Sequence, residues 1–143
     1  MKISTKGIYA LEITVDLAIH SQGSKMESIK TIATRRNLSE KYLERIVGLL
    51  KKGGILASTR GAYGGYTLAK EPKDILISDI LIAAEGNLSP VECLHKDIDC
   101  GINCNKCVTR KLWNEMWNSI KSVVNTTTLE QLVEASKSLD NQS

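Results

Sequence analysis

Apolar side chains recur every three or four positions through the first half of the chain, and this spacing predicts three helices. Thr5, Ser28 and Ser39 stand where these segments begin, and a hydroxyl oxygen there can accept a bond from an unpaired backbone N–H. Asn37-Leu38 marks a tight break before the third segment, and Gly53-Gly54 marks its end. Behind these caps, the predicted helices cover residues 6–19, 29–36 and 40–52.

The hydrophobic period then changes to that of a β-hairpin. Residues 55–60 and 66–69 are interpreted as two strands, joined by a glycine-containing turn and closed by Pro72. Helical spacing returns in a short segment at residues 80–85, which Ser78 or Asp79 is expected to cap.

A long helix is predicted at residues 109–124, and a last helix at 129–137 behind a capping box that begins at Thr127. One side of the long helix is apolar over its whole length, at Leu112, Trp113, Met116, Trp117, Ile120, Val123 and Val124.

Two helices, a tight turn, a third helix and a hairpin follow one another in the order of a winged helix-turn-helix. The sequence therefore predicts a mainly α fold with a small β-hairpin, in which a long helix follows the winged module. In such modules the third helix enters the major groove of DNA. The glycines of the hairpin tip, or wing, would let Arg60 approach the minor groove closely.

The composition of the 143-residue chain is that of a soluble globular protein, with 42% hydrophobic and 24% charged residues. Glu12 and Asp16 interrupt the first apolar segment, so an export signal is not expected, and no apolar run is long enough to span a membrane. We expect a cytoplasmic protein, in whose reducing compartment disulfides are disfavoured. His20 and His95 stand in no nucleophile–base arrangement, so an enzyme is not expected.

The positive charge is concentrated in one part of the chain. The net charge is +3, but residues 25–60 hold nine Lys or Arg residues and only three acids. A basic segment in an otherwise acidic chain indicates binding to phosphate, whereas the plainer interpretation is a solvated surface.

Polar side chains near the start of the third helix are the candidates for reading a DNA operator. Lys41 and Arg45 can reach phosphates or guanine edges, and a carboxylate at Glu44 would accept a bond from a cytosine amine. Glu44 is equally well explained as the exposed partner of a nearby lysine. The predicted DNA-binding residues are Ser39, Glu40, Lys41, Tyr42, Glu44, Arg45, Arg60 and Tyr63.

All four cysteines, Cys93, Cys100, Cys104 and Cys107, fall within residues 93–107, which we call the cysteine loop. Four thiols so close together suit a tetrahedral zinc ion or an iron–sulfur cluster. Free or redox-active thiols are the third interpretation of the spacing, and a thioredoxin-like site lacks its βαβ setting.

Four segments together resemble the Rrf2 family of bacterial transcription regulators, from Met1 to about Val133. They are MKISTKGIYAL at the start, LSEKYLER at 38–45, RGAYGGY at 60–66 and LSPVEC at 88–93. The resemblance implies a homodimer of winged-helix subunits joined through the long helix. It also implies DNA contacts within residues 39–45 and at Arg60.

Some members of this family hold a [2Fe–2S] cluster with three cysteines and a histidine. The resemblance matches those cysteines to Cys93, Cys100 (or, less well, Cys104) and Cys107. Arg110 replaces the histidine, so all-cysteine ligation including Cys104 is inferred, with His95 or a residue of the other subunit as alternatives. Nitric-oxide-sensing relatives carry a [4Fe–4S] cluster. Another branch has no cluster, represses cysteine metabolism and responds to a partner enzyme, and the wing resembles that branch.

These implications divide the chain into a DNA-binding domain at residues 1–77 and a region at 78–143 for sensing and dimerisation. Cluster ligation would pin the helix at 80–85 against the start of the long helix, and so change the placement of the two DNA-reading units. Iron–sulfur supply, redox state or nitric oxide would be the signal. A zinc-stabilised winged-helix protein with no sensing role is the alternative.

Overall fold

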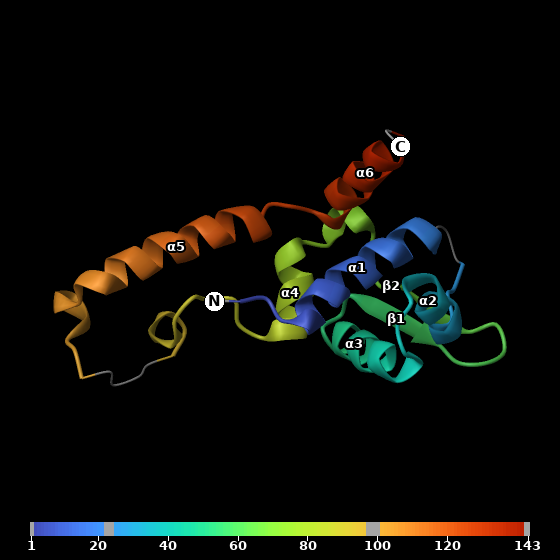
Figure 1. Ribbon diagram of the computed structural model, residues 1–143, viewed down its shortest axis with the longest axis horizontal. Helices are drawn as coiled ribbons and strands as arrows, with labels where there is room; N and C mark the ends of the chain where they lie inside the picture. Colours follow the sequence, from blue (N-terminus) through green and yellow to red (C-terminus); the bar gives the residue numbers. More distant parts are fainter. Residues whose placement is uncertain (1, 22–24, 97–100, 142–143) are drawn as a thin grey trace.

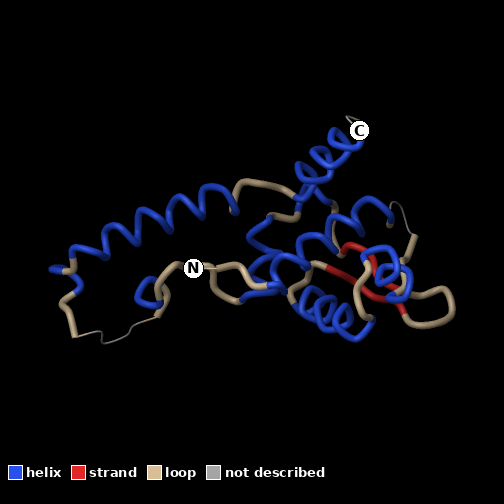
Figure 2. Tube along the Cα trace, viewed as in Figure 1, coloured by secondary structure: helices blue, strands red, loops and turns tan. Residues whose placement is uncertain are grey.

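The computed structural model describes residues 2–21, 25–96 and 101–141. Figures 1 and 2 show a compact part, which we call the head, and a projecting part at residues 92–96 and 101–124, which we call the arm. The head contains α1 (Thr5–His20), α2 (Ile29–Arg36), α3 (Glu40–Lys52), β1 (Leu56–Thr59), β2 (Gly65–Leu68), η1 (Pro72–Asp74), α4 (Ile77–Glu85) and α6 (Leu129–Asp140). The arm contains η2 (Glu92–Leu94), η3 (Cys104–Lys106) and α5 (Val108–Val124).

The helix-turn-helix has the predicted local structure. The Ser28 and Ser39 hydroxyls accept bonds from the backbone N–H groups of the third residues of α2 and α3. Asn37 takes the left-handed conformation that ends α2, with φ 53°. At α1 the prediction was one residue late, because Ser4 and not Thr5 is the N-cap.

The hairpin pairs β1 and β2 antiparallel, with Leu56 opposite Leu68. A third segment joins it, because Glu27 and Tyr66 exchange two backbone hydrogen bonds of 2.9 and 2.7 Å. Gly65 permits this approach, since a Cβ there would lie 2.5 Å from the Glu27 carbonyl oxygen. The sequence pattern did not predict this link between the wing and the segment before α2.

The apolar faces of α1, α3 and α4 meet in one core, which α2, the hairpin and α6 complete. Full burial of a large apolar side chain contributes roughly 1.5–3 kcal/mol, so this core accounts for the stability of the head. The largest fully buried side chains are Ile13, Leu17, Ile32, Leu43, Ile46, Leu50, Ile55, Ile75, Ile80, Leu129, Val47 and Thr14.

The structure differs from the prediction at the start of α4 and in the capping box of α6, although α6 begins at Leu129 as predicted. α4 begins at Ile77, three residues before the predicted start, and Asp79 accepts a bond from the Leu76 N–H from inside the helix. The capping box of α6 pairs Thr128 with Gln131, one residue later than predicted. Backbone bonds from Ile77 to Thr127, and from Leu129 to Ile75, attach the start of α6 to the start of α4.

The arm contrasts with the head, because no residue of α5 is buried. Trp117 and Val124 contact the edge of the core, whereas Val108, Leu112 and Val123 are at least half exposed. A helix with so much exposed apolar surface is typical of an interaction face. Within the described ranges, no helix is long and apolar enough to cross a membrane.

Candidate nucleic-acid interface and cysteine loop

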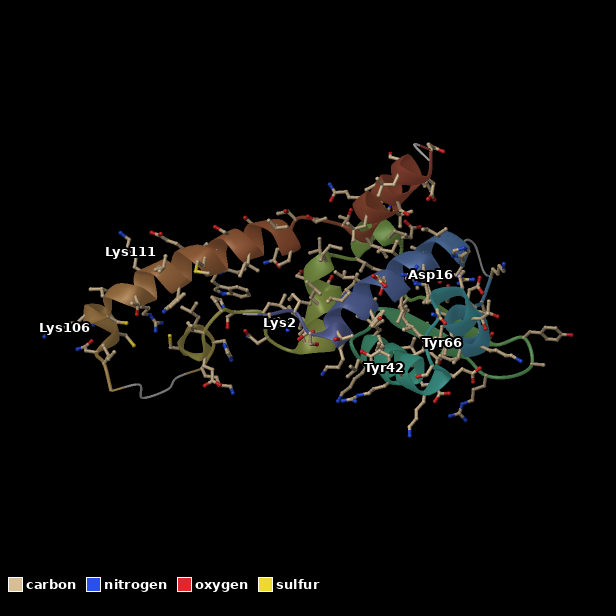
Figure 3. The ribbon with its side chains drawn as sticks, in the orientation of Figure 1. Lys2, Asp16, Tyr42, Tyr66, Lys106 and Lys111 are labelled. Carbon is tan, nitrogen blue, oxygen red and sulfur yellow. The ribbon has the colours of Figure 1, made fainter. Side chains whose placement is uncertain are left out.

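The exposed side of α3 carries most of the residues predicted to contact DNA. Glu40, Lys41, Glu44 and Arg45 are exposed, whereas the apolar positions between them are buried in the core. Figure 3 shows side chains reaching outward from this side of the head. The helix therefore presents charged groups to a ligand and is held rigidly from behind.

Ser39 and Tyr42 also have structural contacts. The Ser39 oxygen accepts the Tyr42 N–H at 3.2 Å, which leaves its hydroxyl proton free to meet a phosphate. The half-buried ring of Tyr42 meets the ring of Tyr9 edge to face, with centroids 5.9 Å apart. Tyr42 thus joins α3 to α1 as well as standing beside the exposed face.

Glu44 makes no ion pair in the part of the chain that the structure describes, as the ion pairs there involve other acids. This observation weakens its interpretation as the partner of a lysine. The interpretation as an acceptor for a cytosine amine stays a prediction.

Two arginines of the basic segment form ion pairs with acidic residues of the head. The Arg35 guanidinium donates to both carboxylate oxygens of Asp16, at 2.6 and 3.0 Å, and lies 3.7 Å from Glu27. The hydrogen bonds to Asp16 raise the pKa of Arg35. Arg36 pairs with Glu12 at 2.8 Å. Part of the predicted phosphate-binding charge is therefore already neutralised by α1.

The wing tip is fully open to solvent. Tyr63 is 97% exposed and Arg60 is exposed beside it. The turn depends on Gly64, where a Cβ would lie 2.0 Å from the Thr59 carbonyl oxygen. A tight, side-chain-poor turn that displays one cation and one aromatic ring suits insertion beside a duplex.

The described cysteines lie in the arm. Cys93 is in η2, Cys104 begins η3, and Cys107 is the N-cap of α5. The fourth, Cys100, lies outside the described residues. Among the residues that are described, no three Cys, His, Asp or Glu side chains are grouped closely enough to hold a metal ion.

Arg110, in the first turn of α5, contacts several parts of the cysteine loop. Its Nη1 donates to the Cys93 carbonyl oxygen at 3.3 Å and to the Cys104 sulfur at 3.5 Å. The Thr109 hydroxyl, 3.4 Å from the Cys107 sulfur, lowers the pKa of that thiol, and the Arg110 backbone N–H acts in the same direction. The sequence identified Arg110 only as a missing ligand.

His95 is exposed, and its Nδ1 lies 2.6 Å from the Ser89 hydroxyl. The Ser89 hydroxyl also lies 3.2 Å from the Val91 carbonyl oxygen. The contact between His95 Nδ1 and Ser89 orients the imidazole and leaves Nε2 without a partner in the described structure. His95 therefore keeps one nitrogen that can bind a metal.

Glu85, the last residue of α4, caps α1 from across the head. Its Oε1 accepts the backbone N–H groups of Ser4 and Gly7, each at 3.0 Å, and also contacts the Ser4 hydroxyl. A Cβ at Gly7 would lie 2.5 Å from the same oxygen. A carboxylate at a helix N-terminus is stabilising. The residue that leads out of the head towards the cysteine loop thus holds the start of α1.

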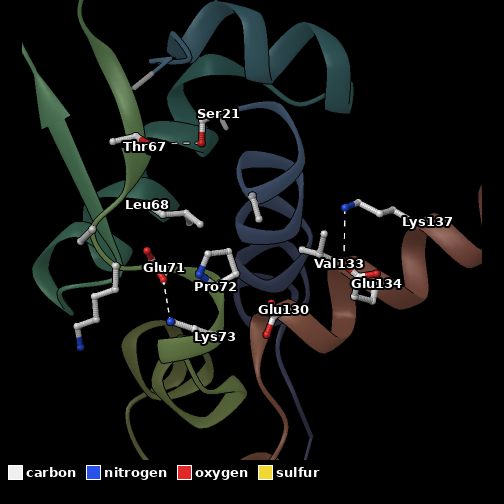
Figure 4. Close-up of a pocket in the computed structure, with 13 residues that line it drawn as sticks. Ser21, Thr67, Leu68, Glu71, Pro72, Lys73, Glu130, Val133, Glu134 and Lys137 are labelled. Carbon is white, nitrogen blue, oxygen red and sulfur yellow. Dashed lines mark hydrogen bonds and ion pairs between the residues drawn. The ribbon is translucent and has the colours of Figure 1, made fainter. Parts of the chain in front are cut away.

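A cleft of about 700 Å³ lies between the end of α1, the segment after β2 and α6 (Figure 4). Its charged residues have both signs and are exposed, and two ion pairs, Lys73–Glu71 and Lys137–Glu134, flank it. No cysteine and no predicted DNA-binding residue lines this cleft.

Comparison with known proteins gives one consistent result. The sequence model of the Rrf2 family, described as an iron-dependent transcriptional regulator, matches residues 3–135. The HTH-type transcriptional regulator CymR of Bacillus subtilis (strain 168) is 44% identical over 132 residues, which are 92% of this chain and 89% of that protein. The solved structure of CymR, the global cysteine regulator of B. subtilis, has a TM-score of 0.77 at 41% identity and covers 94% of this chain and 98% of its own.

The chain is also similar to regulators named IscR. IscR of Vibrio atlanticus (strain LGP32) is 34% identical over 140 residues, covering 98% of this chain and 79% of that protein. The solved structure of T. potens IscR has a TM-score of 0.76 at 37% identity, covering 95% of this chain and 88% of its own. These matches confirm the predicted fold and extend over both the head and the arm.

Proposed function

The chain belongs to the Rrf2 family of DNA-binding transcriptional regulators, and from this premise we propose that its cysteine loop binds an iron–sulfur cluster whose state adjusts DNA recognition. The observation that supports the proposal is that the three described cysteines lie in segments that meet at the start of α5. Arg110 donates to the Cys93 carbonyl oxygen and to the Cys104 sulfur, and Cys107 is at the N-cap position of the same helix. Thiolates are the usual protein ligands of such clusters.

The donor set fits a cluster by its chemistry, although the loop must close for three ligands to meet. We infer that Cys93, Cys100, Cys104 and Cys107 are the ligands, with [2Fe–2S] as the first candidate and [4Fe–4S] as the second. Metal binding commonly orders a loop that is open without it. When bound, the cluster would supply a group sensitive to oxidants, nitric oxide and iron shortage.

The head would bind operator DNA through α3 and the wing. Lys41, Arg45 and Arg60 are exposed cations without ion-pair partners in the described structure, and they suit phosphates or guanine edges. The remaining proposed contacts are Ser39, Glu40, Tyr42, Glu44 and Tyr63.

A second copy of the chain would cover the apolar side of α5. No α5 residue is buried in one chain, while Trp113, Met116 and Ile120 repeat along one side of the helix. Packing two such helices together would remove this surface from water and set the distance between two heads. That distance selects the spacing of operator half-sites.

Glu85 would couple a structural change in the cysteine loop to the head. It ends α4 immediately before the segment that leads to the cysteine loop, and it caps α1, which contacts α3. Closure of the loop around a cluster would act on α4 and hence on the start of α1. If Glu85→Gln left the effect of cluster loading on DNA affinity unchanged, this coupling would be wrong.

A cluster-free regulator of cysteine metabolism is the second candidate function. The 44% identity with CymR favours it, and so does the absence of a grouped metal site among the described residues. In that case a regulatory protein partner would act on the head, and the thiols would be free or would hold zinc.

Anaerobic purification followed by metal and sulfide analysis separates these candidates. We expect a coloured protein that contains iron and acid-labile sulfide and absorbs visible light. A Cys93→Ala variant should contain less iron and sulfide and absorb less. A colourless protein with one zinc per chain would establish the zinc alternative. A colourless protein without metal would leave the cluster-free regulator.

A further inference from the structure

We propose that Arg110 is a positioning residue of the cysteine loop, whose guanidinium ties two segments of the loop together and places a positive charge beside the cluster ligands. This inference rests on the proposed cluster. The geometry that carries it is the double contact of one Arg110 nitrogen with the Cys93 carbonyl oxygen at 3.3 Å and with the Cys104 sulfur at 3.5 Å. One side chain thus connects η2, η3 and α5.

The location of Arg110 is unfavourable for a cation unless an anion stands nearby. It lies in the first turn of α5, at the positive end of the helix dipole, and no acid occupies that turn. Arg110 forms no ion pair with a carboxylate within the described residues, although its side chain is half-buried. The groups that it does face are a carbonyl oxygen and thiols, and a thiol becomes an anion when it binds iron.

Charge counting gives this contact a measurable consequence. Four thiolates around an oxidised [2Fe–2S] core leave the site doubly negative, and the addition of one electron makes it triply negative. A guanidinium beside a ligand sulfur stabilises the reduced state more than the oxidised state, because the attraction grows with the negative charge. Hydrogen bonds to ligand sulfurs act in the same direction. Arg110 should therefore raise the reduction potential of the cluster.

Lys111 provides a matched control on the same helix end. It is exposed, its side chain makes no hydrogen bond or ion pair within the described structure, and Figure 3 shows it on the side of α5 turned away from the cysteine loop. Lys111→Gln removes the same charge, one residue further along, without removing the loop contacts. Arg110→Lys keeps the charge but loses the planar fork.

The experiment is a reductive titration of wild-type, Arg110→Gln, Arg110→Lys and Lys111→Gln proteins. Each is reconstituted anaerobically with ferrous iron and sulfide, titrated with dithionite in the presence of redox mediators, and followed by visible absorption. We expect Arg110→Gln to shift the potential to more negative values, so that the ratio of reduced to oxidised cluster at a fixed potential falls about tenfold. Arg110→Lys should shift it less, and Lys111→Gln least.

Two results would overturn the role of Arg110 without affecting the proposed function. One is an Arg110→Gln cluster with the wild-type reduction potential, and the other is an equal shift of the reduction potential in Arg110→Gln and Lys111→Gln. If the wild-type protein assembled no cluster from iron and sulfide, the proposed function would fail and this inference with it. Thermal unfolding of the head in each variant separates a change in potential from a loss of folding.

Discussion

The head and the arm use their apolar residues in opposite ways. In the head, α1, α3 and α4 turn their apolar sides inward, and residues such as Ile13 and Leu50 are 0% exposed. In the arm, α5 is as long as α1 and has a similar apolar stripe, yet none of its residues is buried. One chain therefore completes the head by itself and leaves the arm incomplete.

This difference indicates what each part responds to. The proposed DNA-reading face is fixed by a closed core and by ion pairs behind it, so its shape is set before any ligand arrives. The arm has its thiols at one end and its uncovered stripe along α5, and both are suited to binding events. A regulator built in this way can keep its reading face rigid while binding at the arm changes how two heads are held.

The largest expected effect comes from breaking the buried ion pair behind the reading face. Asp16→Ala removes the buried carboxylate that accepts the hydrogen bonds of Arg35 and leaves only Glu27 near the guanidinium. We expect the free energy of unfolding to fall by about 3–5 kcal/mol. Urea unfolding measures this change. Glu12→Ala, which removes the exposed partner of Arg36, is the control and should cost within about 1 kcal/mol. Equal losses in the two variants would contradict the distinction.

Apolar truncation compares the two parts directly. Ile13→Ala in the head creates a cavity and should lower the free energy of unfolding by about 2–5 kcal/mol. Leu112→Ala on the arm, where the residue is 50% exposed, should change the free energy of unfolding of the head, measured in the full chain, by no more than about 0.5 kcal/mol. Chemical unfolding at low protein concentration distinguishes them, and a large loss in Leu112→Ala would show that the arm is not independent.

Self-association should be sensitive to substitutions in the arm, which have little effect on the stability of the head. Ile120→Asp places a charge in the apolar stripe of α5. The dissociation constant of the dimer should therefore rise by about tenfold or more, while the head stays folded. Asn118→Asp, on an exposed position of the same helix, is the matched control. Sedimentation velocity measures both variants. A dimer that persisted unchanged in Ile120→Asp would rule out α5 as the joining surface.

The smallest effect is a stabilisation at Gly48. This glycine lies inside α3 on its exposed side, and a Cβ there would meet nothing within 4 Å. Gly48→Ala should therefore raise the free energy of unfolding by about 0.5–1 kcal/mol, because alanine restricts the unfolded chain. If DNA approaches this side closely, the same substitution should weaken DNA binding. Tighter DNA binding by the variant would contradict the assignment of this face.

Features encoded by neighbouring residues were predictable from the sequence. The Ser28 and Ser39 caps, the break at Asn37 and the hairpin depend on residues a few positions apart, and the structure confirms them. The start of α4 was placed three residues late, because Ile77 and Ser78 are buried by tertiary contacts with no local signal.

Links between distant residues were not predictable from spacing alone. Glu85 caps α1 across 78 and 81 positions, and Asp16 meets Arg35 across 19. Arg35 was counted with the phosphate-binding cations because its sequence neighbours do not reveal Asp16. In the cysteine loop the spacing identified the thiols, but only the structure places Arg110 against Cys93 and Cys104.

DNA affinity with and without the cluster tests the central claim most directly. Duplexes are selected from a random library by the anaerobic, iron- and sulfide-reconstituted protein. The selected duplex is then titrated with that protein and with the same preparation stripped of iron by a chelator. The account predicts an affinity difference of about tenfold or more, which corresponds to a coupling free energy within the usual allosteric range. Equal affinity of the two forms for the selected duplex would contradict a sensory role for the cysteine loop.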